Sequence, residues 1–200
     1  MGRWNIRWSI LLVLWCVTGV KLAAMKVESL DRGWFFNRGY ESQAADKVTV
    51  DLPHTWNAAD AMFGNVIYYR GMSTYSRFIV VPSSENFKRV FLRVKAAQTV
   101  ADVYLDNHFV AQHKGGYTSF TVELTHLIRK GEKHKLDIRV SNAQTMEIAP
   151  ICGDFNIWGG LNRGVELLYT DDACIDPTFY GSSGVFFTQC DVSEKYAGLE

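Results

Sequence analysis

Apolar and polar side chains alternate residue by residue in several short segments of this chain, and that alternation limits the fold more than any other feature. The clearest examples are residues 47–52, 89–95 and 135–141, where valine, leucine or isoleucine takes every second position. A period of two puts the apolar side chains of a segment on one face, as in a β-strand with one buried side. The sequence therefore predicts a protein built from amphipathic strands.

The other predicted strands are also short, and turn residues separate them. They lie at residues 74–81, 100–105, 108–113, 119–124 and 165–169. Asp106-Asn107 joins the second and third of these as a two-residue turn, which predicts a β-hairpin. After residue 24 no segment has a sustained 3.6-residue apolar period, and residues 124–128 are expected to form one helical turn. We therefore expect an all-β fold, an antiparallel β-sandwich or jelly roll.

The first 24 residues have the pattern of a secretory signal peptide. Arg3 and Arg7 precede an apolar run from Ile10 to Val20, and Leu22-Ala23-Ala24 offers a small-residue cleavage site. That run is too short for a comfortable transmembrane span. Cleavage after Ala24 would make this an exported protein, periplasmic or extracellular, with no membrane attachment. A lipid anchor on Cys16 is the alternative, although the bulky Trp15 before it disfavours that reading.

The alternation stops at residues 171–184, an acidic and glycine- and serine-rich stretch, and a new apolar run opens at Val185. We expect residues 25–170 to form one sandwich domain and residues 171–184 to be a linker. Residues 185–200 are expected to be the first strand of an incomplete second sandwich domain. A lone β segment cannot bury its apolar face, so the polypeptide is expected to continue beyond Glu200.

Charge and cysteine content exclude some classes of protein. Lysine plus arginine and aspartate plus glutamate both number 21, and a nucleic-acid or anionic-membrane binder would show a basic excess instead. After the leader, Cys152, Cys174 and Cys190 remain, an odd number with no C-x-x-C pair. Neither a disulfide framework nor a zinc site is indicated, and the disulfide state of these three cysteines stays open.

Residues 154–165 concentrate the chemistry that binds sugars. The segment combines the Asp154 carboxylate, the Phe155 and Trp158 rings, the Gly159-Gly160 pair and an arginine. A carboxylate accepts hydrogen bonds from hydroxyl groups, an aromatic ring covers the C–H face of a pyranose, and glycine lets the backbone approach closely. The alternative is that both rings are core residues beside a glycine turn.

Six motifs occur in an order that identifies a family. They are Leu52-Pro53-His54-Thr55-Trp56-Asn57, Tyr68-Tyr69-Arg70-Gly71, Val90-Phe91-Leu92-Arg93, Ala101-Asp102-Val103-Tyr104-Leu105-Asp106-Asn107, His113-Lys114-Gly115-Gly116-Tyr117-Thr118-Ser119-Phe120 and Gly159-Gly160-Leu161-Asn162-Arg163-Gly164-Val165. Together they resemble the N-terminal sugar-binding domain of glycoside hydrolase family 2, a galactose-binding-domain-like jelly roll, in its secreted bacterial β-galactosidase type. The resemblance covers residues 28–170, and Val185 matches the entry into that family's immunoglobulin-like domain.

The resemblance implies a retaining exo-glycosidase, in which two barrel glutamates about 5 Å apart perform the chemistry. No pair of carboxylates in these 200 residues fits those roles, so catalysis is expected from sequence beyond residue 200 and the chain alone is expected to be inactive. The implied partners are a β-galactoside or related glycan and the barrel and immunoglobulin-like domains of the same enzyme. The alternatives are a free-standing carbohydrate-binding module, or the same family acting on β-glucuronides or β-mannosides.

Two residues are implied to touch substrate. In β-galactosidase members an aspartate lies six residues before the second small residue of the Gly-Gly-like motif, which places it at Asp154. An asparagine precedes the strand entered by the Tyr-Tyr-Arg-Gly motif, which places it at Asn65. Asp154 could also help to hold a monovalent cation. No cofactor is expected within this chain, but Na⁺ or Mg²⁺ is an expectation for the full-length enzyme. A turn asparagine and a loop aspartate are the structural alternatives.

Other motif residues are expected to be structural. Trp56 is interpreted as a core residue under the His54 loop, and Gly115-Gly116 as a tight connection that needs a positive φ. The sequence does not identify the partners of Arg70 and Arg163.

Overall fold

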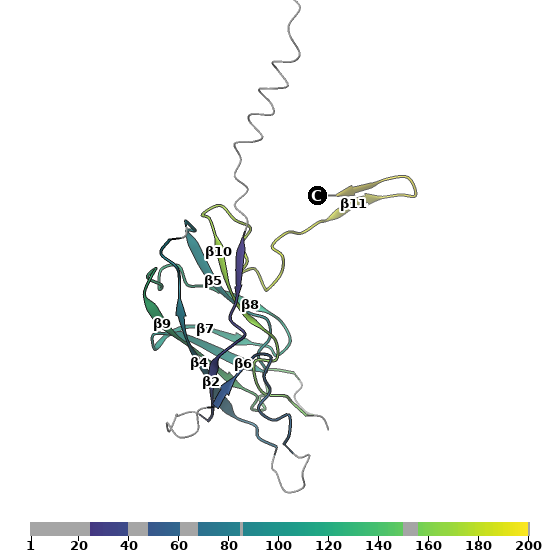
Figure 1. Cartoon of the computed structure of the whole chain (residues 1–200). Coiled ribbons are helices and arrows are strands. Elements are labelled where there is room, and N and C mark those ends of the chain that lie inside the picture. The colour runs from purple at the N-terminus through teal and green to yellow at the C-terminus, as the bar shows by residue number, and fades with distance from the viewer. Residues whose placement is uncertain (1–24, 40–47, 61–67, 85, 150–155, 200) are drawn as a thin grey trace, which may run out of the picture.

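A computed structural model describes residues 25–39, 48–60, 68–84, 86–149 and 156–199 (Figure 1). Every regular element in these ranges is a strand. The strands are β1 (Lys26–Ser29), β2 (Trp34–Arg38), β3 (Val48–Val50), β4 (Met72–Val80), β5 (Arg89–Val94), β6 (Val100–Leu105), β7 (His108–Lys114), β8 (Phe120–Glu123), β9 (Lys133–Ser141), β10 (Val165–Thr170), β11 (Gln189–Val192) and β12 (Ala197–Leu199).

Ten of the strands form two antiparallel sheets that face each other. One sheet has four strands in the order β1-β10-β5-β8, and the other has six in the order β3-β2-β4-β9-β6-β7. Each sheet combines strands from distant parts of the chain: β1 pairs with β10 in one sheet, and β2 pairs with β4 in the other. This arrangement confirms the expected antiparallel β-sandwich.

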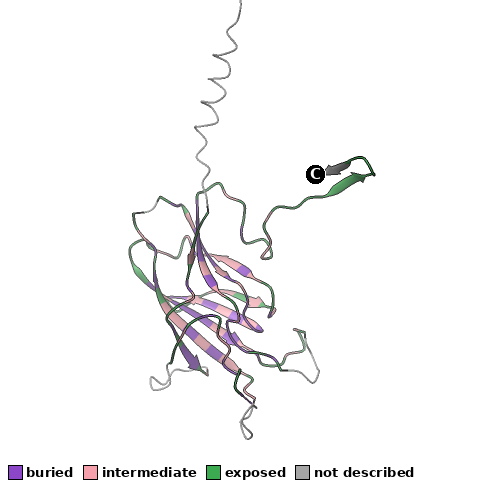
Figure 2. Cartoon of the chain, turned by 45° about the vertical axis from the view of Figure 1, so that its right-hand side comes forward, coloured by how far each residue is buried: buried purple, intermediate pink, exposed green. Residues whose placement is uncertain are grey.

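The core fills the space between the sheets, as the buried stripes in Figure 2 show. Alternate residues of β5 and β10, such as Leu92 and Leu167, meet Tyr75 of β4 and Ile138 of β9 in one continuous apolar cluster. Burial follows the alternation of the sequence, because successive side chains of a strand point to opposite faces. The apolar positions that alternate in the sequence are thus the side chains that fill one shared core.

Most predicted strands agree with the structure to within two or three residues. The hairpin is formed by β6 and β7, and its turn residues Asp106 and Asn107 both have positive φ, 49° and 67°. The expected helical turn is present, since the N–H groups of Leu127 and Ile128 both donate to the Leu124 carbonyl. The prediction missed β1 and β2.

The segment 171–184 packs against the four-stranded sheet. Arg89 of β5 lies over the ring of Phe91, donates to Cys174 Sγ (3.4 Å) and forms an ion pair with Glu123 of β8 (2.8 Å). Pro177 is buried. The residues expected to link two domains therefore help to cover the outer face of this sheet.

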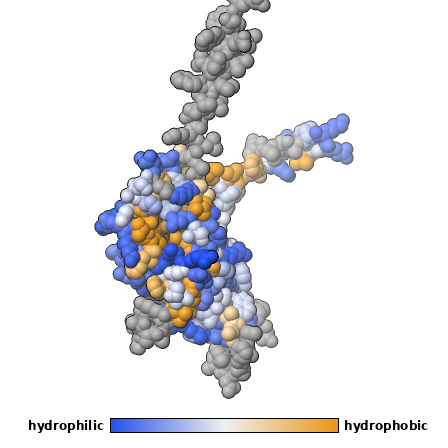
Figure 3. Space-filling view, viewed as in Figure 1, coloured by the Kyte–Doolittle hydropathy of each residue, from blue (hydrophilic) through white to orange (hydrophobic). Residues whose placement is uncertain are grey.

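Beyond that segment the chain leaves the sandwich as an extended arm that ends in the β11–β12 hairpin (Figure 1). Two paired strands occupy the region where one strand was expected, and the first begins at Gln189 instead of Val185. Val185, Phe186 and Phe187 in the arm are exposed apolar residues. Figure 3 shows apolar surface in orange where the arm leaves the body.

Within the described ranges, no helix has the length and apolarity needed to cross a membrane. The predicted signal peptide, residues 1–24, lies outside these ranges.

Candidate functional site

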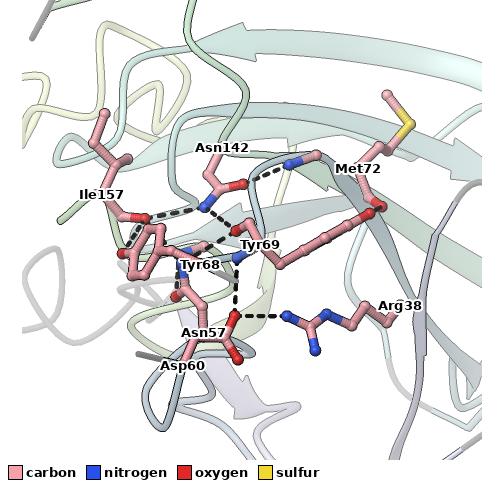
Figure 4. A network of polar contacts seen from close by, with 10 residues as sticks. Arg38, Asn57, Asp60, Tyr68, Tyr69, Met72, Asn142 and Ile157 are labelled. Carbon is pink, nitrogen blue, oxygen red and sulfur yellow. Dashed lines mark hydrogen bonds and ion pairs between the residues drawn. The ribbon is translucent and has the colours of Figure 1, made fainter. Parts of the chain in front are cut away.

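The two residues expected to touch substrate, Asn65 and Asp154, both lie outside the described residues. The structure does describe the residues that flank them: Asp60 and Tyr68 on the two sides of Asn65, and Asn156 after Asp154. These flanking segments meet in one network of polar contacts (Figure 4). This network is therefore the described part of the candidate site.

The backbone carbonyl of Ile157 is the centre of the network. It accepts hydrogen bonds from three side chains: Tyr68 Oη at 2.7 Å, Asn142 Nδ2 at 3.0 Å and Asn57 Nδ2 at 3.1 Å. Asn57 and Ile157 are 100 positions apart in the sequence. One peptide group thus fixes the segment after Asp154 to the segments before and after Asn65.

Asn57 and Asn142 play matching roles in this network, and both are completely buried. Each donates from Nδ2 to the Tyr69 carbonyl as well as to Ile157. The Oδ1 of Asn57 accepts from the Gly159 N–H (3.0 Å), and the Oδ1 of Asn142 accepts from the Gly71 N–H (2.9 Å). Both side-chain amides therefore have hydrogen-bond partners for their NH₂ group and for their oxygen, as buried amides require.

A partly buried ion pair lies at Asp60, the last described residue before Asn65. Arg38 of β2 lies 2.6 Å from Asp60 Oδ2, and the same oxygen accepts the backbone N–H of Tyr69 at 3.0 Å. The Arg38 guanidinium also stacks over the Tyr69 ring at 4.5 Å. The Asp60 side chain is 8% exposed, so its charge is held by two donors in a largely dry environment.

The Gly159-Gly160 pair lets the chain pass close to two aromatic residues. A Cβ atom on Gly159 would lie 2.1 Å from the Trp56 ring, and one on Gly160 would lie 2.3 Å from the His54 carbonyl oxygen. Gly160 also has a φ of 136°, which favours glycine. Trp56 is buried and stacks on Phe36. These contacts confirm Trp56 as a core residue and give both glycines a steric role.

Trp158 faces solvent between these fixed neighbours. Its side chain is 44% exposed, whereas Ile157 is buried. The Ile157 carbonyl before it and the Gly159 amide after it are both hydrogen-bonded within the network. The alternative that Trp158 is a core residue is therefore wrong, and its ring is exposed four positions after Asp154 in the sequence.

Burial sets the ionisation of the side chains beneath the glycine pair. Burial lowers the pKa of His54 and raises the pKa of Tyr75. The Tyr75 hydroxyl lies 2.7 Å from His54 Nδ1. Burial also raises the pKa of Tyr68. All three groups are therefore neutral near pH 7, and they act here as hydrogen-bonding scaffold.

The sequence did not reveal the anchoring residues Asn57 and Asn142. Asn57 stands in one of the six motifs, but nothing local marks it as buried, and its partners are remote in sequence.

The structure also describes the other motif residues that the sequence analysis singled out. Gly115 has the positive φ expected, 138°. Arg70 donates to Gln144 Oε1 (3.4 Å), and Arg163 is exposed.

The cation expected at Asp154 lies at a residue outside the described ranges. Within those ranges no group of three or more histidine, cysteine, aspartate or glutamate side chains could hold a metal ion.

Comparison with known proteins gives a consistent family. A family model described as glycosyl hydrolase 2 galactose-binding domain-like matches residues 65–150. The chain is 40% identical over 168 residues to a β-glucuronidase of Bacteroides fragilis, an alignment that takes in 84% of this chain and 24% of the relative. It is 29% identical over 134 residues to a β-galactosidase of Thermoanaerobacter pseudethanolicus, covering 66% of this chain and 18% of the relative.

A solved structure extends the likeness to the fold. A calcium-binding mutant of a Bacteroides uniformis β-glucuronidase superposes with a TM-score of 0.79 at 31% identity, over 88% of this chain and 22% of that one. The chain thus spans about a quarter or less of the length of these relatives. The sequence motifs, the sandwich and the family match agree. This chain therefore contains the galactose-binding-like N-terminal domain of glycoside hydrolase family 2.

Proposed function

We propose that this chain is the sugar-binding and scaffold part of a retaining exo-glycosidase that degrades carbohydrate, with the catalytic glutamates supplied by sequence beyond residue 200. Membership of the family supports the reaction class, and the small share of each relative that the chain covers supports a larger enzyme. The observation that carries the proposal is the network at Ile157. It ties the segments next to Asn65 and Asp154 to one rigid carbonyl.

This anchoring suits a pocket wall that must keep its shape while substrate turns over. Residues on loops reach catalytic precision only when neighbouring contacts fix them. In the proposal Asp154 accepts hydrogen bonds from sugar hydroxyls and Asn65 both donates and accepts. The exposed Trp158 ring offers an apolar face beside them.

We propose β-glucuronides ahead of β-galactosides as the substrate class. The relative with 40% identity is named a β-glucuronidase, whereas the β-galactosidase is 29% identical. This order differs from the preference for galactosides that the motifs alone gave. A metal ion in the full-length enzyme remains part of the proposal, and its support is that the Bacteroides uniformis structure is named a calcium-binding mutant. The placement of a cation at Asp154 rests on the motif alone.

The test uses the polypeptide that carries this chain together with its downstream sequence. Hydrolysis of p-nitrophenyl β-D-glucuronide, β-D-galactoside and β-D-mannoside is compared, and the anomer released first is identified by NMR. We expect the glucuronide to be the best substrate and its configuration to be retained. Hydrolysis of none of the three, or inversion at the anomeric carbon, would contradict the proposal.

We also propose that residues 1–24 direct export and are removed. Sequencing the N-terminus of the mature protein checks this, and a mature chain that begins at Met1 would refute it.

A further inference from the structure

A cavity lies between the start of β8 and the turn at residues 178–181. Its volume is about 600 Å³. The residues that line it share aromatic rings or hydroxyl groups, apart from one glycine: His113, Thr118, Ser119, Phe120, Thr121, Thr178, Phe179, Tyr180 and Gly181. None of them belongs to the network around Ile157, and the sequence motifs assign them no ligand.

Hydrogen bonds and close packing hold the two walls of this cavity together. Ser119 Oγ donates to the Gly181 carbonyl at 3.2 Å. A Cβ atom on Gly181 would lie 2.2 Å from the Ser119 carbonyl oxygen, so only glycine permits this approach. On the β8 side the His113 and Phe120 rings stack at 4.4 Å. The cavity is therefore a built feature of the domain.

Tyr180 is an unusual residue for the turn that carries it. The Ser182 N–H donates to the Phe179 carbonyl (2.9 Å), and the two central residues, Tyr180 and Gly181, have φ values of 45° and 66°. Turns with two positive φ values strongly favour asparagine, aspartate or glycine at the first of these positions. A tyrosine there is strained.

Packing among the described residues does not explain the tyrosine either. Its side chain is 88% exposed, and its ring meets the Phe179 ring edge-to-face at 5.0 Å. A strained residue that neither the turn nor the core requires points to a functional role.

The lining defines the kind of ligand that fits. Among the described lining residues none is aspartate, glutamate, lysine or arginine, so the cavity offers no partner for a charged ligand. Burial lowers the pKa of His113, which keeps the imidazole neutral. Hydroxyl groups and open ring faces suit a neutral molecule that has hydroxyls and an apolar C–H face.

We propose that this cavity is a binding site for a neutral saccharide, in which the Tyr180 ring covers the C–H face of one sugar unit and the threonine and serine hydroxyls bond its hydroxyl groups. This site goes beyond the proposed glycosidase function, because every residue that forms it lies in this chain. It could therefore hold a glycan while the enzyme acts elsewhere on the same molecule.

The test is an NMR titration of the purified chain with cellobiose, lactose and xylobiose, followed through the backbone amides of residues 178–182. The central variant is Tyr180→Asn, which removes the ring and gives the turn its preferred Asn-Gly pair. We expect at least one disaccharide to bind with a millimolar dissociation constant, and about ten-fold weaker binding to the variant. The variant should have an equal or higher melting temperature, because asparagine tolerates a positive φ.

Two further variants act as controls. Tyr180→Phe should keep the binding, and so should Tyr117→Asn, since Tyr117 is an exposed tyrosine that does not line the cavity. The proposal would be overturned if none of the sugars shifted the amide resonances, or if the sugar-induced shifts were unchanged in Tyr180→Asn. It would also be overturned if the resonances shifted with protein concentration alone, because the cavity would then be occupied by a second copy of the chain. None of these results bears on hydrolysis, so the glycosidase proposal is tested separately.

Discussion

Replacing Asn142 by alanine should destabilise the domain and loosen the segment that carries Asp154. The variant loses three hydrogen bonds, but the losses are unequal. The carbonyls of Tyr69 and Ile157 keep their bonds to Asn57, whereas the Gly71 N–H loses Asn142 Oδ1 as its acceptor. An orphaned donor costs about 1–3 kcal/mol and each of the two other lost bonds about 1 kcal/mol, so we expect a loss of about 3–5 kcal/mol.

Urea unfolding of the purified chain measures this loss. The matched control is Asn156→Ala, an exposed asparagine in the same loop, which should change stability by less than about 0.5 kcal/mol. A second variant, Asn142→Asp, places an oxygen where two carbonyl oxygens lie 3.0 and 3.3 Å away. Only its protonated form can donate to them, so folding should raise the pKa of the new carboxyl. The variant should then lose stability as the pH rises from acid to neutral.

Equal stability of Asn142→Ala and wild type would refute the network as an anchor. So would an Asn142→Asp variant whose stability does not depend on pH in this range.

The remaining predictions concern packing and pH. Gly159→Ala should cost about 1–3 kcal/mol in urea unfolding through overpacking, because its Cβ would lie 2.1 Å from the Trp56 ring; an unchanged midpoint would contradict this contact. The hydrogen bond from Arg89 lowers the pKa of Glu123 from 4.5 to about 2, so folding favours the ionised carboxylate. This contribution to stability is present above pH 4.5 and is lost as the pH falls toward 2. Glu123→Gln should therefore flatten the acid side of the stability–pH curve. Parallel curves for the variant and the wild type would refute the pairing.

The sequence predicted those parts of the fold that depend on local pattern. The β6–β7 hairpin was found because its alternation and its Asp106-Asn107 turn lie within fifteen consecutive residues. β2 was missed because Trp34, Phe35 and Phe36 are all apolar, so the segment shows no alternation. In the structure Trp34 and Phe36 are buried, while Phe35 is 45% exposed on the outer face.

The candidate site was less predictable because its contacts are long-range. No local feature of the sequence marks Asn57 as buried, yet its amide bonds the Ile157 carbonyl and the Gly159 N–H across 100 and 102 positions. Only the assembled sandwich brings these segments together. Trp158 shows the same limit, since the sequence left its ring either sugar-facing or in the core, and only the fold shows that it is exposed. The roles expected for Asn65 and Asp154 rest on the family resemblance and stay predictions.

The kinetics of Asp154→Ala in the longer polypeptide test the central claim most directly. If this domain forms a wall of the substrate pocket, losing a carboxylate that bonds sugar hydroxyls should lower kcat/KM by about a hundredfold or more. Asn156→Ala, two positions away, should leave kcat/KM near the wild-type value. Wild-type kinetics in a correctly folded Asp154→Ala enzyme would contradict the claim that this domain contributes to the pocket.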